Sequence, residues 1–510
     1  MVVNKTVKQI VAVLILAAIL RFYHLGSNPP SPYWEEAAIG YDAYSVLKTG
    51  KDFHGNAWPL VAFESFGDYK PSLYFYATVP SIAVFGLNTF AVRFPSALFG
   101  TLTVLLVYFL VKDRRVGLLV ALLLAVSPWH LQFSRAGFEA NLGLFLVVLG
   151  VWLLLKNKIL AGAISFAACL YSYHADRIFV PLLLIVLFFI FRQKKVFFTG
   201  VLVILLALPL AVKLNSPQIR QRFNETSAFS TLEPIIKSNQ LIAADGGGLL
   251  PRIIHHRYWQ YGRIFLTNYF SHFNFNYLFI SGDANPRHSI QTVGGLYLIQ
   301  LPFLLYGVLL SLKKRTTEDL VLLSWLFLAP VPAALTLAAP HALRSLALLV
   351  PLTIFTARGL INSRKLLIYG AILILILETG RYLKAYYQIY PRQWAGEWQY
   401  GYQEMVGYVA DNEGKYDHIY ITRSLGRPSI YYWFYTKTDP QLVQAANTKV
   451  KKDQGEYLEF GKINFSLPEG EPAAKSLVVT AAQEASPAKA RLVKEIDDFN
   501  GQVIFKFYEI

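Results

Sequence analysis

The sequence has a single cysteine, Cys169, and this scarcity excludes two kinds of structure. An internal disulfide needs a second cysteine and a cysteine metal cluster needs several, so neither can form within the chain. The chain also lacks solenoid-type repeats and low-complexity tracts. The fold must therefore depend on packing and on polar contacts between side chains of other types.

Charged residues are also scarce, at 16% of the 510 residues, whereas 54% are hydrophobic and 15% are aromatic. Apolar runs recur from Val11 to Leu377. This composition predicts a polytopic α-helical membrane protein rather than a soluble domain. The net charge of +16 could suggest nucleic acid, but the lysines and arginines lie largely in short turns between apolar runs. Such a pattern is typical of cytoplasmic loops, so nucleic acid is not an expected partner.

About twelve apolar runs have a length that suits a membrane helix. They centre on residues 10–25, 73–87, 94–111, 116–128, 140–155, 159–173, 178–192, 196–213, 292–311, 319–338, 343–361 and 365–379. The first run lacks a convincing small-x-small cleavage site, so we interpret it as a retained span with the N-terminus inside. The basic turns expected in the cytoplasm are Lys112–Arg115, Lys156–Lys158, Arg192–Lys195, Lys313–Arg315 and Arg364–Lys365.

This topology divides the chain into a membrane domain, residues 1–379, and an extracytoplasmic domain, residues 380–510. The membrane domain includes a first external loop at 26–72 and a large external loop at 214–290. An inside N-terminus and an outside C-terminus require an odd number of crossings. Either the run at 73–87 does not fully cross or a crossing is hidden before residue 140, so we expect about 11 to 13 membrane helices.

The C-terminal region mixes charged, aromatic and polar residues with short alternating stretches. These stretches predict strands of a small α/β domain. The predicted strands are His418–Thr422, Ser429–Tyr435, Ser476–Thr480 and Gly501–Tyr508.

Two adjacent acids, Glu35 and Glu36, follow a proline-rich turn in the first external loop. In an extended backbone the two side chains would face opposite ways, so one could face a cavity while the other bonds locally. A desolvated carboxylate in a cavity could act as a general base on an acceptor hydroxyl or amine. Alternatively, both acids solvate the interface or cap a helix that begins near Ala37. The sequence alone leaves both alternatives open.

Several basic residues lie near predicted outer ends of helices, and together they suit a phosphate or diphosphate group. Snorkelling and local pairing, such as Asp176 with Arg177 or Glu139 with Arg135, are the structural alternatives. The candidate phosphate-binding residues are Lys70, Arg135, Arg177 and Arg344. Arg93 is a further cation, but the uncertain number of crossings does not assign it to one side of the membrane.

His255 and His256 are adjacent in the chain, and the side chains of adjacent residues rarely converge on one metal ion. No nearby acid gives a convincing metal-ligand spacing. We therefore name no metal ligands; a divalent metal is conceivable, but the sequence gives it no support, and no other cofactor is implied. The candidate substrate contacts are Asp68, Tyr69, His174 and His255.

Three segments follow the acidic pair. Their residues and their order along the chain resemble those of the dolichyl-phosphate-mannose-protein mannosyltransferase family, which includes the aminoarabinose lipid A transferases. The segments read GDYKPSLYFY at 67–76, VRFPSALFG at 92–100 and SPWHLQFSR at 127–135. The resemblance implies the GT-C fold and a polyprenyl-phosphate sugar donor. It places Glu35 at the position of the family's catalytic aspartate and Lys70 at that of a lysine that contacts the lipid phosphate. Tyr69 stands where aminoarabinose transferases have an acid, so the resemblance does not extend to a metal site that uses that acid.

We therefore expect a glycosyltransferase of the cell membrane that inverts the anomeric carbon and passes a monosaccharide to a lipid, protein or glycan on the outer face. Either Glu35 or Glu36 would take the acceptor proton, while Lys70 and arginines such as Arg135 or Arg177 would stabilise the departing phosphate. A transporter or flippase of a lipid-linked saccharide is the alternative from another class, although internal repeats are lacking. A third is a non-catalytic partner in a glycosylation complex.

Overall fold

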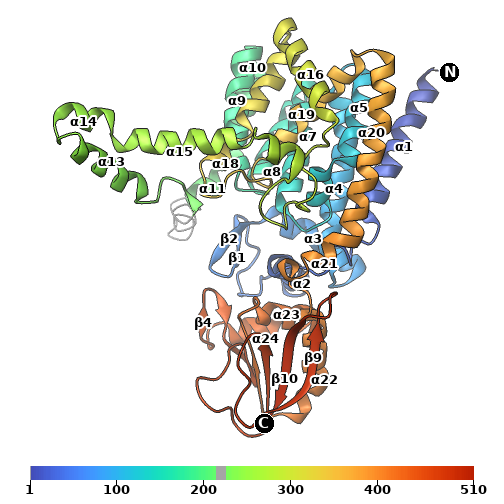
Figure 1. Ribbon diagram of the computed structural model, residues 1–510. Coiled ribbons are helices and arrows are strands. Elements are labelled where there is room, and N and C mark those ends of the chain that lie inside the picture. The colour runs from blue at the N-terminus through green and yellow to red at the C-terminus, as the bar shows by residue number, and fades with distance from the viewer. Residues whose placement is uncertain (1, 214–225) are drawn as a thin grey trace. The chain divides into compact units, whose positions relative to one another are not determined.

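The computed structural model describes residues 2–213 and 226–510 (Figure 1), so residues 214–225 of the predicted large external loop lie outside the described part. The described residues form two compact units. The helical unit contains the described residues up to 20, together with 100–133 and 140–382. The loop unit contains residues 21–99, 134–139 and 383–510.

The helical unit consists of apolar helices and the segments between them, as the hydrophobic runs predict. Five of its helices, α1, α4, α6, α7 and α20, include residues of the loop unit. The helices are α1 (Val2–Phe22), α4 (Thr89–Leu110), α5 (Arg114–Val126), α6 (Pro128–Ser134), α7 (Glu139–Leu155), α8 (Ile159–Leu170), α9 (Asp176–Phe191), α10 (Lys194–Leu206), α11 (Leu208–Lys213), α13 (Glu233–Ala244), α14 (Leu249–Ile254), α15 (Arg257–Ser271), α16 (Gln300–Lys314), α17 (Thr317–Leu328), α18 (Val331–Ala334), α19 (Leu349–Ile361) and α20 (Lys365–Lys384).

Among the described residues, three helices are long and apolar enough to cross a membrane: Thr89–Leu110, Thr317–Ala334 and Lys365–Gln393. The pair α5 and α6, bent by 61°, would make a fourth span. The predicted run at 73–87 forms only the 13-residue α3 (Leu73–Phe85), which is about 20 Å long against a hydrocarbon core of about 30 Å. It belongs to the loop unit and packs against α2 (Trp34–Thr49) there. These facts favour the alternative in which this run does not fully cross.

Two glycines allow α16 and α19 to pack at very short range within the helical unit (Figure 1). A Cβ atom built on Gly307 would lie 1.9 Å from the carbonyl oxygen of Phe355, and one on Gly359 would lie 1.8 Å from that of Phe303. Small residues at helix crossings in membranes permit this close approach of two backbones. The contact depends on the absence of a side chain at both positions.

We expect Gly307→Ala to destabilise the helical unit by about 1–3 kcal/mol, because a backbone atom of α19 must move to admit the methyl group. Thermal unfolding of the purified protein in detergent measures the loss. Gly370→Ala is the matched control, since a Cβ at this glycine of α20 meets nothing within 4 Å. Equal melting temperatures for the two variants would contradict the role of the close contact.

The loop unit begins with α2, a β-hairpin and α3. The hairpin pairs β1 (Ala62–Ser65) with β2 (Asp68–Pro71) in antiparallel register, so that Phe63 lies opposite Lys70. Phe63 is fully buried and stacks on Phe75 of α3, with 4.3 Å between the ring centroids. This stacking holds the hairpin, and therefore Lys70, against α3.

The C-terminal part of the loop unit is a six-stranded sheet with the order β6-β7-β3-β8-β10-β9. Strand β3 is parallel to β7 and β8, and β10 is antiparallel to β8 and β9. Its strands are β3 (His418–Ile421), β6 (Glu459–Phe460), β7 (Ile463–Asn464), β8 (Ser476–Ala481), β9 (Arg491–Asp497) and β10 (Val503–Glu509), and a separate pair joins β4 (Lys452–Asp453) to β5 (Glu456–Tyr457). The helices of this part are α21 (Tyr390–Gln393), α22 (Tyr402–Asn412), α23 (Pro428–Thr436) and α24 (Pro440–Ala446).

Three of the four predicted strands are confirmed as β3, β8 and β10, but the prediction of a strand at Ser429–Tyr435 is wrong. This segment is α23, with Pro428 in its first turn, where the missing N–H of proline costs nothing. The residues from Pro428 to Phe434 are all buried. A continuous aromatic run of this kind has no two-residue period, and burial on all sides overrides its β propensity.

Candidate active site

The two adjacent acids lie in the first turn of α2, which begins at Trp34 rather than near Ala37. Tyr33 is the N-cap, and its backbone N–H donates to Oε2 of Glu36 at 3.4 Å. Consecutive residues of a helix point about 100° apart. Glu35 and Glu36 therefore enter different surroundings, although the backbone is helical rather than extended.

Glu36 is fully buried and bound by a buried arginine from α4. The Nε atom of Arg93 donates to Oε1 of Glu36 at 2.8 Å, and its Nη2 donates to Oε2 at 2.9 Å. The backbone N–H of Gly137 adds a third bond to Oε1, at 2.7 Å. Both side chains of the ion pair have no exposed surface. The capping alternative thus describes Glu36 best, and its carboxylate serves as an internal crosslink.

The remaining donors of Arg93 fix the start of the first loop. Nη1 donates to the carbonyl oxygens of Leu25 and Pro29, at 3.2 and 2.8 Å, and Nη2 donates to that of Ser31 at 2.8 Å. The guanidinium also lies over the ring of Trp398, 5.6 Å from its centroid. The sequence marked Arg93 only as one of several cations. The available signal was the position of this arginine inside an apolar helix, because an arginine in such surroundings needs an acidic partner.

Glu35 has a different environment, because 30% of its side chain is exposed. The Tyr33 hydroxyl donates to its Oε2 at 2.9 Å, and Nζ of Lys70 lies 2.6 Å from its Oε1. Lys70, on β2, also lies 3.5 Å from Oδ2 of Asp68. The helix and the hairpin thus bring a carboxylate and an ammonium group together at a partly exposed position.

A second acid, Glu139, lies within electrostatic reach of Lys70 and Glu35. It is the first residue of α7, and only 6% of it is exposed. From the sequence, we considered Glu139 only as a partner for Arg135. Its electrostatic interaction with Glu35 and Lys70 was therefore not predicted. The motif SPWHLQFSR ends a few residues before it, which is the one signal that could have drawn attention to this acid.

Arg135 lies in the loop unit but binds backbone atoms. Its Nη1 donates to the carbonyl of Arg21 at 3.2 Å, and its Nη2 donates to those of Tyr23 and Asn28 at 2.7 and 3.0 Å. Its Nε donates to the hydroxyl of Tyr386 at 3.2 Å. In this arrangement the guanidinium anchors the end of α1 and the start of the first loop.

The other predicted site residues lie in the helical unit. Arg177 contacts Nδ1 of His174 at 2.9 Å, Arg344 donates to the Thr336 hydroxyl at 2.7 Å, and His255 lies 2.7 Å from a carboxylate oxygen of Asp245. The loop unit therefore gathers Glu35, Glu36, Asp68, Tyr69, Lys70 and Arg135, together with Arg93 and Glu139. Among the described residues, a histidine and aspartate cluster of the helical unit has the spacing that could hold a metal ion.

Comparisons with known proteins agree with the sequence motifs. Residues 11–158 match the model of the dolichyl-phosphate-mannose-protein mannosyltransferase family. No curated protein shows a significant sequence match. The structure is similar to that of ArnT from Cupriavidus metallidurans bound to undecaprenyl phosphate, with a TM-score of 0.56 and 11% identity over 98% of this chain and 97% of that chain. The apo state of the same protein gives 0.56 and 10% identity over 99% and 98% of the two chains.

An archaeal oligosaccharyltransferase, AglB from Archaeoglobus fulgidus, matches with a TM-score of 0.49 and 14% identity over 91% of this chain. The present chain spans about 61% of the length of that protein. The family match and the ArnT likeness confirm the predicted resemblance and the GT-C fold.

Proposed function

We propose that this chain, a transferase of the GT-C type, moves a monosaccharide from a polyprenyl-phosphate donor to a lipid, protein or glycan acceptor. The observation that carries the proposal is the Glu35–Lys70 pair, with 2.6 Å between Oε1 and Nζ at a partly exposed position. The likeness to an enzyme bound to undecaprenyl phosphate supports a lipid-linked donor of this class. The reaction would take place on the outer face of the cell membrane, with the first loop and residues 380–510 extracytoplasmic and about 11 to 13 membrane helices in the chain.

Glu35 is the general base of the proposed reaction. An acceptor hydroxyl or amine gives its proton to the Glu35 carboxylate while its oxygen or nitrogen bonds to the anomeric carbon. The bond from that carbon to the phosphate oxygen breaks, and the electron pair leaves with the lipid phosphate. A single displacement of this kind inverts the anomeric centre, because the acceptor attacks the face opposite the leaving group.

Lys70 stabilises the departing phosphate. Its ammonium group is a mobile point charge that can pass from Glu35 to a phosphate oxygen without moving the hairpin. Placing it beside negative charge that develops in the transition state lowers the barrier more than it strengthens donor binding. The same movement frees Glu35 to accept the proton, so that donor binding activates the base.

Glu36 and Arg135 have supporting roles in this proposal. The oxygens of Glu36 are bound by Arg93, Gly137 and Tyr33, and the donors of Arg135 are bound by carbonyl groups. Both residues would hold the first loop in the shape that presents Glu35. Arg177 and Arg344 stay predictions as phosphate contacts, and so do His174 and His255 as substrate contacts.

We expect Lys70→Ala to lower sugar transfer by about 10²-fold or more, since it removes charge stabilisation at the leaving group. The measurement is transfer or hydrolysis of radiolabelled sugar from a panel of polyprenyl-phosphate donors by the purified protein. Lys48→Ala is the matched control, because Lys48 is exposed at the end of α2, beside the ring of Tyr44. Transfer at the wild-type rate by Lys70→Ala would contradict the proposed role.

A further inference from the structure

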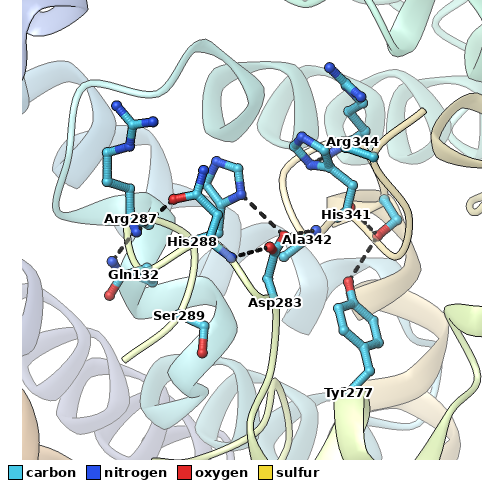
Figure 2. Close-up of polar contacts among 12 residues, drawn as sticks. Gln132, Tyr277, Asp283, Arg287, His288, Ser289, His341, Ala342 and Arg344 are labelled. Carbon is cyan, nitrogen blue, oxygen red and sulfur yellow. Dashed lines mark hydrogen bonds and ion pairs between the residues drawn. The ribbon is translucent and has the colours of Figure 1, made fainter. Parts of the chain in front are cut away.

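A cluster of one aspartate and two histidines lies in the helical unit, whereas Glu35 and Lys70 of the proposed transferase site belong to the loop unit. Asp283 and His288 belong to the segment after the π-helical turn η1 (Asn276–Ile280), and His341 belongs to the turn before the 3₁₀ turn η2 (Leu346–Leu348). Figure 2 shows the side chains from these two segments side by side. Asp283 and His288 are buried, with 5% and 9% of each residue exposed.

Hydrogen bonds and a ring contact fix the positions of all three residues. Oδ2 of Asp283 lies 3.1 Å from Nδ1 of His288 and accepts the backbone N–H of Ala342 at 2.6 Å. The backbone N–H of His341 donates to Nε2 of His272 at 3.1 Å. The rings of His288 and His341 are 4.8 Å apart between centroids. The two segments are therefore joined through Asp283, and the imidazoles meet beside it (Figure 2).

The separations suit a single metal ion. One ligand atom from each of the three residues lies within 4.8 Å of the others, whereas two ligands of one tetrahedral zinc ion are about 3.4 Å apart. The Asp283–His288 distance already fits such a pair. Closing His341 onto the ion needs a side-chain movement of about 1 Å, which rotation about its own bonds can supply.

We propose that Asp283, His288 and His341 bind a divalent transition-metal ion, for which Zn²⁺ has the best-matched ligand preferences. Two imidazoles and one carboxylate are a usual set for zinc, and they leave one coordination position for water or an anion. A pocket whose lining includes Trp129, Gln132 and Tyr277 also includes two of the three proposed ligands, Asp283 and His288. The ion would crosslink two segments that lie far apart in the sequence.

The competing explanation is a metal-free hydrogen-bond cluster that joins the same two segments. It predicts the observed contacts equally well, because each oxygen of Asp283 has an N–H donor within 3.1 Å. The two explanations differ in what happens when a metal ion is offered to the folded protein.

The test is Co²⁺ binding by the full-length protein, purified in detergent and stripped with a chelator. Cobalt replaces zinc in such sites and gives visible absorption bands that report its geometry. We expect one equivalent of Co²⁺ to bind to the wild type, Zn²⁺ to displace it, and His288→Ala, His341→Ala and Asp283→Asn each to weaken binding at least tenfold. Asp283→Asn keeps the shape of the residue and an acceptor for Ala342, so a loss of binding by this variant does not require unfolding.

His255→Ala is the matched control, because His255 also contacts an aspartate, Asp245 at 2.7 Å, but lies outside the cluster. This control is expected to bind Co²⁺ like the wild type. The proposal is overturned if the folded wild type binds no Co²⁺ at micromolar concentrations. It is also overturned if Asp283→Asn and the two alanine variants bind as tightly as the wild type. Sugar transfer is not part of this test, so its outcome does not depend on the proposed function.

Discussion

Glu35→Gln is expected to lower sugar transfer by about 10²- to 10⁴-fold while the protein stays folded, since this is the usual contribution of a positioned general base. The amide has nearly the same shape as the carboxylate and keeps an oxygen that can accept the hydrogen bond from Tyr33. It cannot accept the proton of the acceptor. The side chain is partly exposed, so its neutralisation leaves no buried charge without a partner.

The measurement compares Glu35→Gln, Glu36→Gln and wild type in the radiolabelled donor assay, with thermal unfolding and donor binding recorded on the same samples. Loss of turnover with normal melting and binding in Glu35→Gln identifies the base. Full activity in this variant, with loss confined to a well-folded Glu36→Gln, would transfer the role to Glu36. Binding of donors without turnover by the wild type, across a broad panel, would instead favour the transporter or the non-catalytic partner.

Arg93→Met is expected to destabilise the loop unit by about 3–5 kcal/mol, the usual cost of breaking a buried ion pair by removing one partner. Glu36 would keep its charge in a fully buried position, and the carbonyls of Leu25, Pro29 and Ser31 would lose their donors. Arg93→Lys should recover only part of this loss, because an ammonium group cannot reproduce the paired donors of the guanidinium.

Thermal unfolding in detergent and limited proteolysis of the first loop measure this effect. Arg115→Ala is the matched control: its partner Asp113 lies at 3.8 Å and 84% of the arginine side chain is exposed, so the expected loss is under about 1 kcal/mol. The double variant Glu36→Gln/Arg93→Met should be more stable than Arg93→Met alone, because it removes the unpaired charge. Normal stability of Arg93→Met would contradict the crosslinking role of the pair.

The acidic pair illustrates what could and could not be predicted from the sequence. The sequence predicted an external loop for the pair and singled out Lys70, and it left both alternatives for the two acids open. The groups that distinguish Glu36 from Glu35 are Arg93 and Gly137, which come 57 and 101 residues later. A local pattern carries no information about such distant partners. Arg135 is a related case, since backbone carbonyls, which every residue has, bind most of its donors.

For the fold, the accuracy of the prediction depended on the periodicity of apolar residues in the sequence. Long apolar runs predicted most helices of the helical unit, and alternation predicted β3, β8 and β10. The error at α23 came from an aromatic run in which burial on all sides removes the alternation that separates strands from helices. The aspartate and histidine cluster was missed because His341 follows His288 only after two predicted membrane helices.

The order in which the chain is synthesised gives the Arg93–Glu36 pair a consequence for assembly. A nascent first loop has no cation to pair with Glu36 until Arg93 has left the ribosome, and the bond from Gly137 must wait longer still. The first loop therefore cannot be locked by these bonds until the chain has been synthesised past Gly137, and every shorter nascent chain holds an unlocked loop. A chain truncated before α4 would expose the proposed catalytic loop to proteases, whereas one extended past Gly137 would carry the means to protect it.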